Sequence, residues 1–202
     1  VALDMVAPGR PIPGDADLIV VPGSKSTLGD LAFLRDQGWD IDILAHHRRG
    51  GAVLGICGGY QMLGREVRDP EGIEGKAGVG RGLGLLDVET ELERRKTLAE
   101  AEGVEAATGE RVSGFEMHMG RTTGPDTRRP MFRLDGDRPD GAVSLDGRVR
   151  GAYLHGMFSA GGFRHAFLDR IRARTPSGLD YEAEVDGVLD RLAGHLDLHL
   201  DV

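Results

Sequence analysis

The sequence predicts an α/β protein whose sheet is mostly parallel and carries helices on both faces. Two apolar runs, 18–21 (Leu-Ile-Val-Val) and 52–56 (Ala-Val-Leu-Gly-Ile), have the uninterrupted hydrophobicity of strands that are buried on both sides. Residues at helical spacing follow each run, and this alternation of strand and helix is typical of parallel sheets. The chain has 202 residues without an internal repeat or a linker, so we expect one domain over residues 1–202.

Around these runs, the first part of the chain predicts short elements between glycine-rich turns. A weak alternation indicates a strand over residues 1–6. A helix is expected between a cap at Ser26 or Thr27 and a stop at Gly38. A second helix is expected over 39–49. Its inward stripe would comprise Ile41, Leu44 and Ala45.

The rest of the chain gives weaker signals. A helix with Tyr60, Leu63 and Val67 on one face should follow the second apolar run, and the glycine-rich segment 72–84 indicates a loop. The polar segment 94–109 has no convincing period. Further strands are expected over 85–92, 111–119, 141–145 and 148–154. Two amphipathic helices are expected at the end, over 163–171 and 181–196.

The composition excludes several classes of protein. Lys and Arg total 25 against 33 Asp and Glu, and the resulting charge of −8 argues against nucleic-acid binding. The apolar runs are too short to cross a membrane. The single cysteine excludes an intramolecular disulfide and a multi-cysteine metal site, and it fits the reducing cytoplasm. Because the first residue is Val1 and not Met, we expect a processed piece of a longer polypeptide.

The strongest chemical signal is the segment 55–61, Gly-Ile-Cys-Gly-Gly-Tyr-Gln, where a predicted strand meets a predicted helix. The pattern G-x-C-x-G is the thiol form of a nucleophile elbow, in which glycines make room for a strained turn. Such a turn would present Cys57 to solvent at a helix start, where the helix dipole favours a thiolate. The amide of Gly58 would face a developing oxyanion. A lone cysteine is commonly a small core residue, but the flanking glycines favour a nucleophile.

A nucleophilic thiolate needs a general base, which is usually a histidine. His155 directly follows the predicted strand 148–154, at the edge where parallel sheets place catalytic groups. His118 lies in a half-apolar strand, where a site role and a purely structural, hydrogen-bonded role are both open. The remaining histidines are expected on exposed helix surfaces: His46, His47, His165, His195 and His199.

Four segments together carry a resemblance to a known family. They are Pro-Gly-Ser-Lys-Ser-Thr at 22–27, the elbow at 55–61, Gly-Phe-Glu-Met-His-Met-Gly at 114–120 and Tyr-Leu-His-Gly at 153–156. In order and spacing over 17–171, the chain resembles the C-terminal glutamine amidotransferase domain of cobyric acid synthases. The resemblance implies a flavodoxin-like, class I amidotransferase fold that hydrolyses glutamine to glutamate and ammonia. It also implies an N-terminal synthetase domain, absent here, that uses ATP and Mg to amidate corrinoid carboxylates in cobalamin biosynthesis.

The resemblance also assigns roles to single residues. Cys57 matches the nucleophile and His155 the base, while the amides of Gly23 and Gly58 match the oxyanion hole. Gln61 matches a position beside the bound glutamine, although a cap on its own helix would explain it equally well. The implied partners are glutamine and the synthetase domain of the same polypeptide. For this chain itself the resemblance implies no metal and no cofactor.

Three further positions bear on the predicted site. Most class I amidotransferases continue His-x-Glu, with the Glu orienting the base, but Met157 stands there in this chain, as in close relatives of cobyric acid synthase. Glu116 is a candidate orienter by its chemistry, against the alternative of a solvated strand glutamate. Lys96 is a candidate contact to the substrate carboxylate or to the partner domain, against the alternative of a solvated lysine.

Other functions stay open at this point. The chain could be the glutaminase of a related amidotransferase that acts on a cell-wall precursor or on another corrinoid. A non-catalytic docking module with an inert Cys57 is a second alternative, which the complete elbow and His155 disfavour. The glycine run 72–80 is not a phosphate loop, because no buried strand leads into it and no Ser or Thr follows its lysine.

Overall fold

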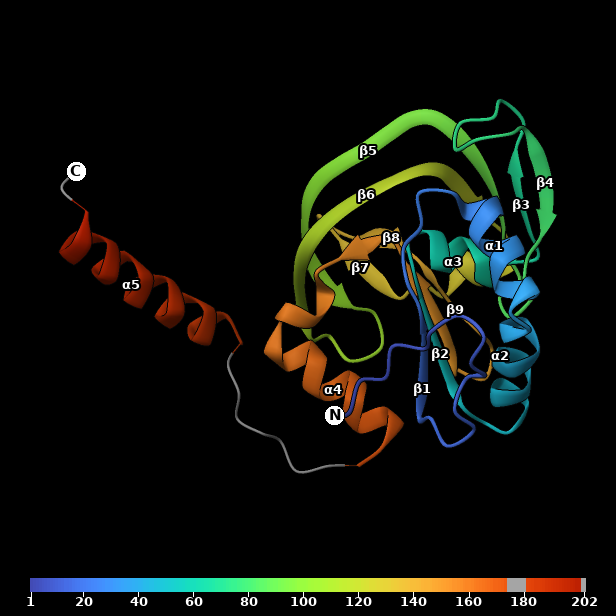
Figure 1. The fold of residues 1–202 in the computed structure, drawn as a ribbon. Coiled ribbons are helices and arrows are strands. Elements are labelled where there is room, and N and C mark those ends of the chain that lie inside the picture. The colour runs from blue at the N-terminus through green and yellow to red at the C-terminus, as the bar shows by residue number, and fades with distance from the viewer. Residues whose placement is uncertain (174–180, 201–202) are drawn as a thin grey trace.

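The computed structural model describes residues 1–173 and 181–200, and at 95–97, 181 and 182 it describes the backbone alone. Two sheets and the helices packed on them form the body of the molecule, and α5 (Tyr181–His199) lies apart from this body in Figure 1. Within the described ranges, no helix is both long enough and apolar enough to cross a membrane.

The first sheet contains both strands that the apolar runs predict. Its order is β1 (Leu18–Val21), β2 (Ala52–Ile56), β10 (Val149–Ala152) and β9 (Ala142–Val143). The strands β1, β2 and β10 are parallel, and β9 is antiparallel to β10. This sheet is therefore mostly parallel, as expected.

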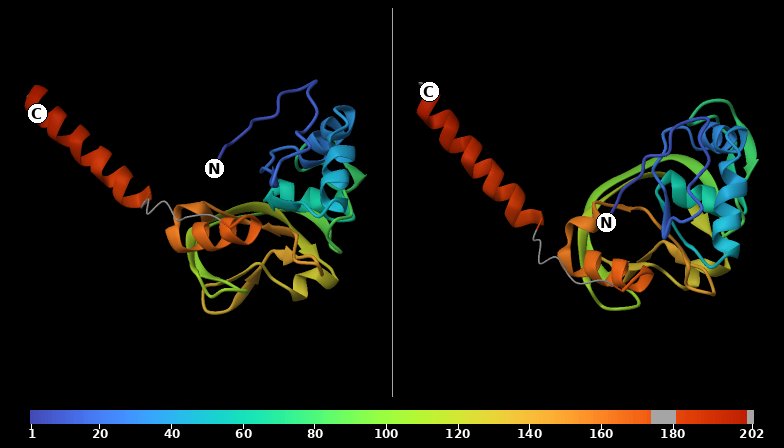
Figure 2. Two further views of the ribbon diagram at one scale, coloured as in Figure 1. Left: turned by 90° about the horizontal axis from the view of Figure 1, so that it is seen from below. Right: turned by 60° about the horizontal axis from the view of Figure 1, so that its bottom comes forward.

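Helices cover both faces of this sheet (Figures 1 and 2). Neighbouring residues of β2 therefore point into different cores. Val53 packs in a core with three helices, α1 (Thr27–Asp36), α2 (Trp39–Arg48) and α3 (Gly58–Leu63). Leu54 packs in the other core with α4 (Gly161–Ile171) and with the second sheet. Burial on both faces explains why the run is uniformly apolar. The predicted α/β class is confirmed.

The second sheet is built around a long antiparallel ribbon that arches over one side of the molecule (Figure 1). The ribbon consists of β5 (Glu89–Glu105) and β6 (Arg111–Thr123). Shorter strands complete the sheet: β3 (Glu66–Asp69), β4 (Gly78–Arg81), β7 (Phe132–Leu134), β8 (Arg138–Asp140) and β11 (Leu154–His155). The two short 3-10 helices are η1 (Pro125–Arg128) and η2 (Met157–Ser159).

Several predicted elements are wrong. Residues 1–6 form no strand, and the expected loop over 72–84 contains β4. Val67 lies in β3 and not in a helix. The polar segment 94–109, for which no element is predicted, forms much of β5, because pairing with β6 and burial of single residues such as Ala101 stabilise it without a visible hydrophobic period. The expected strand over 148–154 divides into β10 and β11, which belong to different sheets.

The inward face of α2 is rotated from the predicted stripe. Ile43 and His46 are buried, whereas Ile41 is 65% exposed. Nε2 of His46 lies 3.0 Å from the carbonyl oxygen of Ala52, and burial lowers the pKa of this imidazole. His46, which is expected on an exposed helix surface, is therefore buried and joins α2 to β2. Ser26 precedes α1, but its side chain makes no capping hydrogen bond.

Candidate active site

A strained turn carries Cys57 between the end of β2 and the start of α3. Its backbone has φ 54° and ψ −113°, a conformation that residues with a Cβ rarely adopt. Glycines permit the turn, since a Cβ on Gly55 would come within 2.7 Å of the backbone nitrogen of Tyr60. A Cβ on Gly59 would collide with the carbonyl of Val21 in β1. The elbow geometry that the sequence predicts is present.

The thiol of Cys57 is more enclosed than expected. Cys57 is 8% exposed, so the turn does not lift it into solvent. Burial raises the pKa of the Cys57 thiol, the N–H of Gly58 acts in the opposite direction, and the carboxylates of Glu74 and Asp140 raise the pKa further. The shift is upward overall. The N–H of Gly58 at the start of α3 acts in the predicted direction, but burial outweighs it.

Cys57, Gly23 and His155 meet at one place. A Cβ on Gly23 would lie 3.6 Å from Cβ of Cys57 and 3.6 Å from Cε1 of His155, so both side chains flank the same backbone position. The parallel pairing of β10 with β2 brings the residues after both strands to one edge of the sheet. In this arrangement the thiol of Cys57 donates a hydrogen bond to the carbonyl of Met117 at 3.3 Å, and not to His155.

His155 is held by the second sheet. It ends β11, which pairs with β6, and its ring stacks on the ring of Phe115 with centroids 5.1 Å apart and planes 6° apart. Gly114 is needed at this crossing, because a Cβ there would collide with the carbonyl of His155. Nε2 of His155 is buried and has no hydrogen-bond partner among the described residues. Met157, which stands in the place of the orienting Glu, is buried and apolar.

Gln61 is buried in a polar network. Its carbonyl oxygen accepts a hydrogen bond from the hydroxyl of Thr27 at 3.1 Å. Its amide nitrogen donates to the carbonyl of Met119 at 3.1 Å and to the hydroxyl of Tyr153 at 3.2 Å. The network joins α3 to α1 and β6. The contact of Gln61 with glutamine stays a prediction, and so does the role of Lys96, whose side chain lies outside the described residues.

His118 lies beside the pair of Cys57 and His155. Its ring stacks on Tyr153 with centroids 3.8 Å apart. Burial lowers the pKa of this imidazole, and the charge of Arg138 acts in the same direction. Nδ1 of His118 is buried without a partner in the described part of the chain. His118 is thus a largely buried strand histidine whose environment favours the neutral form.

Two acidic residues are placed differently from what the sequence indicates. Glu116 is buried and pairs with Arg138 through two hydrogen bonds, at 3.0 and 2.5 Å, so it is neither solvated nor directed at His155. Asp140 is buried at the end of β8, where its carboxylate accepts the N–H groups of the two residues before His155. No motif marks Asp140 in the sequence, because the Arg-Pro-Asp segment that contains it resembles a turn.

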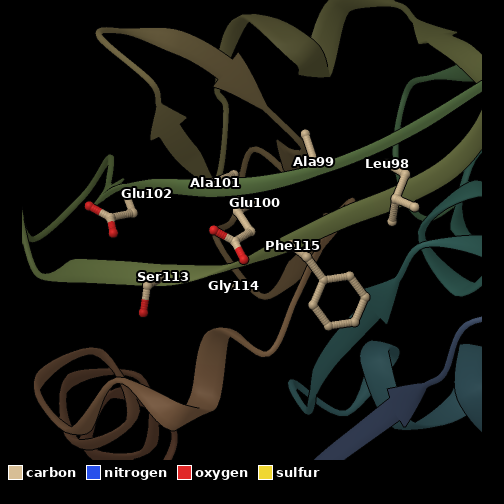
Figure 3. Close-up of a pocket in the computed structure, with 8 residues that line it drawn as sticks. All are labelled: Leu98, Ala99, Glu100, Ala101, Glu102, Ser113, Gly114 and Phe115. Carbon is tan, nitrogen blue, oxygen red and sulfur yellow. The ribbon is translucent and has the colours of Figure 1, made fainter.

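A hollow of about 630 Å³ lies on the β5–β6 ribbon next to these residues (Figure 3). The side chains of Leu98, Glu100 and Phe115 project from the same side of the ribbon. The other lining residues are Ala99, Ala101, Glu102, Ser113 and Gly114. Phe115 connects the hollow to the catalytic edge, because the same ring stacks on His155.

The arrangement has the parts of an acyl-transfer site. It brings together the thiol of Cys57, the N–H of Gly58 bonded to that thiol, the backbone of Gly23, and Nε2 of His155, which has no partner among the described residues. Among the side chains that the structure describes, no group of three or more His, Cys, Asp or Glu could hold a metal ion.

Comparisons with known proteins agree with this chemistry. The chain matches the CobB/CobQ-like glutamine amidotransferase domain over residues 1–163. It is 61% identical to the cobyric acid synthase of Cereibacter sphaeroides over 198 residues, which are 98% of this chain and 41% of that protein. It is 60% identical to the cobyric acid synthase of Paracoccus denitrificans over 202 residues, which are 100% of this chain and 41% of that protein. The chain thus spans about two-fifths of the length of these relatives.

Solved structures share the fold. A crystal structure of a glutamine amidotransferase matches with a TM-score of 0.55 at 20% identity, covering 77% of this chain and 78% of that one. PurLQS from Thermotoga maritima matches with a TM-score of 0.55 at 19% identity, covering 78% of this chain and 81% of that one. The likeness confirms the class I amidotransferase fold that the sequence motifs imply.

Proposed function

This chain belongs to the family of CobB/CobQ-like glutamine amidotransferase domains, and on that basis we propose that it supplies ammonia from glutamine within a cobyric acid synthase. The similar synthases are longer, and this chain spans 41% of their length. We assign the ATP- and Mg-dependent activation of corrinoid carboxylates to the remaining part. The single cysteine is compatible with work in the reducing cytoplasm.

In the proposed reaction, the thiolate of Cys57 attacks the side-chain amide carbon of glutamine. The amides of Gly23 and Gly58 stabilise the oxyanion of the tetrahedral intermediate. His155 then donates a proton to the nitrogen as the carbon–nitrogen bond breaks, so that ammonia leaves and a γ-glutamyl thioester remains on Cys57. Finally, His155 takes a proton from the water that attacks this thioester. The products are glutamate and the regenerated thiol.

Formation of the thiolate is the demanding first step. Burial raises the pKa of the Cys57 thiol, and its proton points at the carbonyl of Met117. We therefore expect the thiol to leave Met117 when glutamine binds and to pass its proton to Nε2 of His155, the nitrogen that has no partner among the described residues.

One observation carries the proposal. Cys57 adopts a strained backbone conformation beside Gly23, where an added Cβ would lie 3.6 Å from Cβ of Cys57 and 3.6 Å from Cε1 of His155. Strain of this kind costs on the order of 1–3 kcal/mol and is concentrated at functional sites. An inert cysteine in a docking module would pack equally well on relaxed backbone, so this geometry favours the nucleophile.

Labelling and mutation in the full-length enzyme test the proposal. A glutamine analogue with an electrophilic diazoketone should alkylate Cys57, as read by peptide mass spectrometry, and excess glutamine should slow the labelling. Cys57→Ala should lose glutamine hydrolysis while its thermal unfolding stays close to that of the wild type. Glutamine turnover by C57A at the wild-type rate would contradict the proposal, as would labelling confined to other residues.

A further inference from the structure

A buried carboxylate outside the catalytic pair holds the chain just before His155. Asp140 is 5% exposed and ends β8. Its Oδ1 accepts the N–H of Tyr153 at 3.2 Å, and its Oδ2 accepts the N–H groups of both Tyr153 and Leu154, each at 3.2 Å. These two residues link β10 to β11, whose last residue is His155.

At this link the chain passes from one sheet to the other. β10 ends at Ala152 beside β2, and β11 begins at Leu154 beside β6. A backbone that leaves one ladder for another loses regular partners for its N–H groups, and buried N–H groups without partners are costly. Because Asp140 supplies these partners, it helps to fix the direction in which β11 leaves the first sheet. The position of His155 depends on that direction.

The chemistry of the contact requires a carboxylate. Three contacts of 3.2 Å join two N–H donors to the two carboxylate oxygens, which carry no hydrogen when ionised. An asparagine would offer one such oxygen, and its NH2 group would face the same donors. A buried charge costs more than a buried amide, so the gain from two acceptors must offset a larger desolvation penalty.

The charges around Asp140 place it in the same electrostatic environment as the catalytic pair. The pKa of Asp140 is raised to about 6, chiefly by burial and also by Glu116, while the N–H groups of the link and Arg138 act in the opposite direction. The field of Asp140 in turn raises the pKa of three neighbouring groups, Cys57, Tyr60 and Tyr153. Asp140 is therefore close enough to the site to influence it, although the proposed reaction does not use it.

We infer that Asp140 is the positioning residue of His155, which it holds beside Cys57 by fixing the link between the two sheets. The inference rests on the proposed function. Asp140 acts through the backbone of Tyr153 and Leu154, while the stacking of Phe115 sets the plane of the imidazole. No acidic side chain bonds the His155 ring among the described residues, and Met157 is apolar, so backbone positioning takes the place of an orienting acid.

The kinetics of glutamine hydrolysis by the full-length enzyme test this role. Asp140→Asn should lower kcat by about tenfold to a hundredfold and leave KM for glutamine unchanged, because displacing a catalytic group by about 1 Å has effects of this size. Asp140→Glu, which keeps both oxygens, should lie between D140N and the wild type. Asp126→Asn is the matched control, since Asp126 is also buried and accepts the N–H of Asp87 at 2.8 Å, away from the link.

Thermal unfolding of each variant gives the folded fraction, so that kcat is expressed per folded enzyme. A wild-type kcat in folded D140N overturns the inference, and so does an equal loss of kcat in D140N and D126N. A loss that appears in KM alone also overturns it. If D140N does not fold, D140E decides: a reduced kcat at unchanged KM supports the inference, and a wild-type kcat overturns it. A wild-type enzyme that did not hydrolyse glutamine would contradict the proposed function instead.

Discussion

The turn at Cys57 and the link before His155 reach the same edge of the sheet by different means. Cys57 is positioned locally, because strand, turn and helix are continuous in sequence and the glycines that permit the turn lie within two residues of it. His155 is positioned by distant residues, Phe115 in β6 and Asp140 in β8. The turn holds Cys57 in a strained backbone conformation, whereas the distant residues set the orientation of His155.

Because of this difference, substitutions in the two regions should have different effects on stability and on catalysis. Changes at the glycines of the turn should affect stability and chemistry together, since these glycines permit the strained conformation of Cys57. Changes at the link should affect chemistry more than stability.

Removal of the imidazole should have the largest effect. His155→Ala in the full-length enzyme is expected to lower kcat for glutamine hydrolysis by about 10²- to 10⁴-fold, because the proton donor to the leaving ammonia is lost. The melting temperature should change little, since Nε2 of His155 makes no hydrogen bond within the described part of the chain. A folded H155A enzyme with wild-type kcat would show that the link does not serve catalysis.

A methyl group at the turn should be costly for stability. Gly59→Ala places a Cβ against the carbonyl of Val21 and is expected to lower the free energy of unfolding by about 1–3 kcal/mol. Gly14→Ala is the control, because no atom lies within 4 Å of its added Cβ, and its effect should stay within about 0.5 kcal/mol. Urea unfolding measures both. Equal costs at the two positions would mean that close packing does not define the turn.

An ion-pair cluster that makes no contact with Cys57 or His155 should affect stability alone. The buried carboxylate of Glu105 bonds Arg150 at 2.8 Å and Arg170 at 2.7 Å. Burial opposes ionisation of Glu105, but hydrogen bonds and charges from Arg170, Thr108 and Arg150 outweigh it and lower its pKa. When the pKa of a carboxyl group is lower in the folded protein than in the unfolded chain, the group stabilises the fold at pH values above its pKa in the unfolded chain. This stabilisation is lost as the pH falls through its pKa in the folded protein.

Glu105→Gln should therefore be less stable than the wild type at pH 7, and the difference should narrow between about pH 5 and pH 3. Denaturant unfolding across this range measures the effect. The kcat per folded enzyme at pH 7 should equal that of the wild type. A constant difference in stability at every pH would contradict the lowered pKa of Glu105.

The smallest effect concerns the reactivity of the thiol. Glu74 adds to burial in raising the pKa of Cys57, so Glu74→Gln should speed alkylation of Cys57 by iodoacetamide about two- to threefold near neutral pH. The glutamine keeps an oxygen that can accept the N–H of Thr27, now bonded to Glu74 at 2.7 Å. Glu71→Gln, at an exposed neighbour, should leave the rate unchanged. Equal rates in all three proteins would show that the charge of Glu74 does not reach the thiol.

The same contrast explains what could be predicted from the sequence. The buried strands and the elbow have local causes, an apolar run and glycines beside Cys57, and local causes leave a pattern in the sequence. The enclosure of Cys57 leaves no such pattern in the sequence, because the carbonyl of Met117, which accepts the thiol hydrogen bond, lies 60 residues away in the chain. Glu116 resembles a solvated strand residue until β8 brings Arg138 against it. Asp140 lies in a strand of three residues, too short for any period to show.

The central claim is that this chain releases ammonia while the amide bond forms elsewhere. The most direct test is amidation of a corrinoid carboxylate by the full-length enzyme carrying C57A, in the presence of ATP and Mg. We expect no amide product with glutamine, and product formation close to the wild-type rate with concentrated ammonium at raised pH, because only neutral ammonia has the lone pair to attack an activated carboxylate. Failure of ammonium to rescue a folded C57A enzyme would contradict the account.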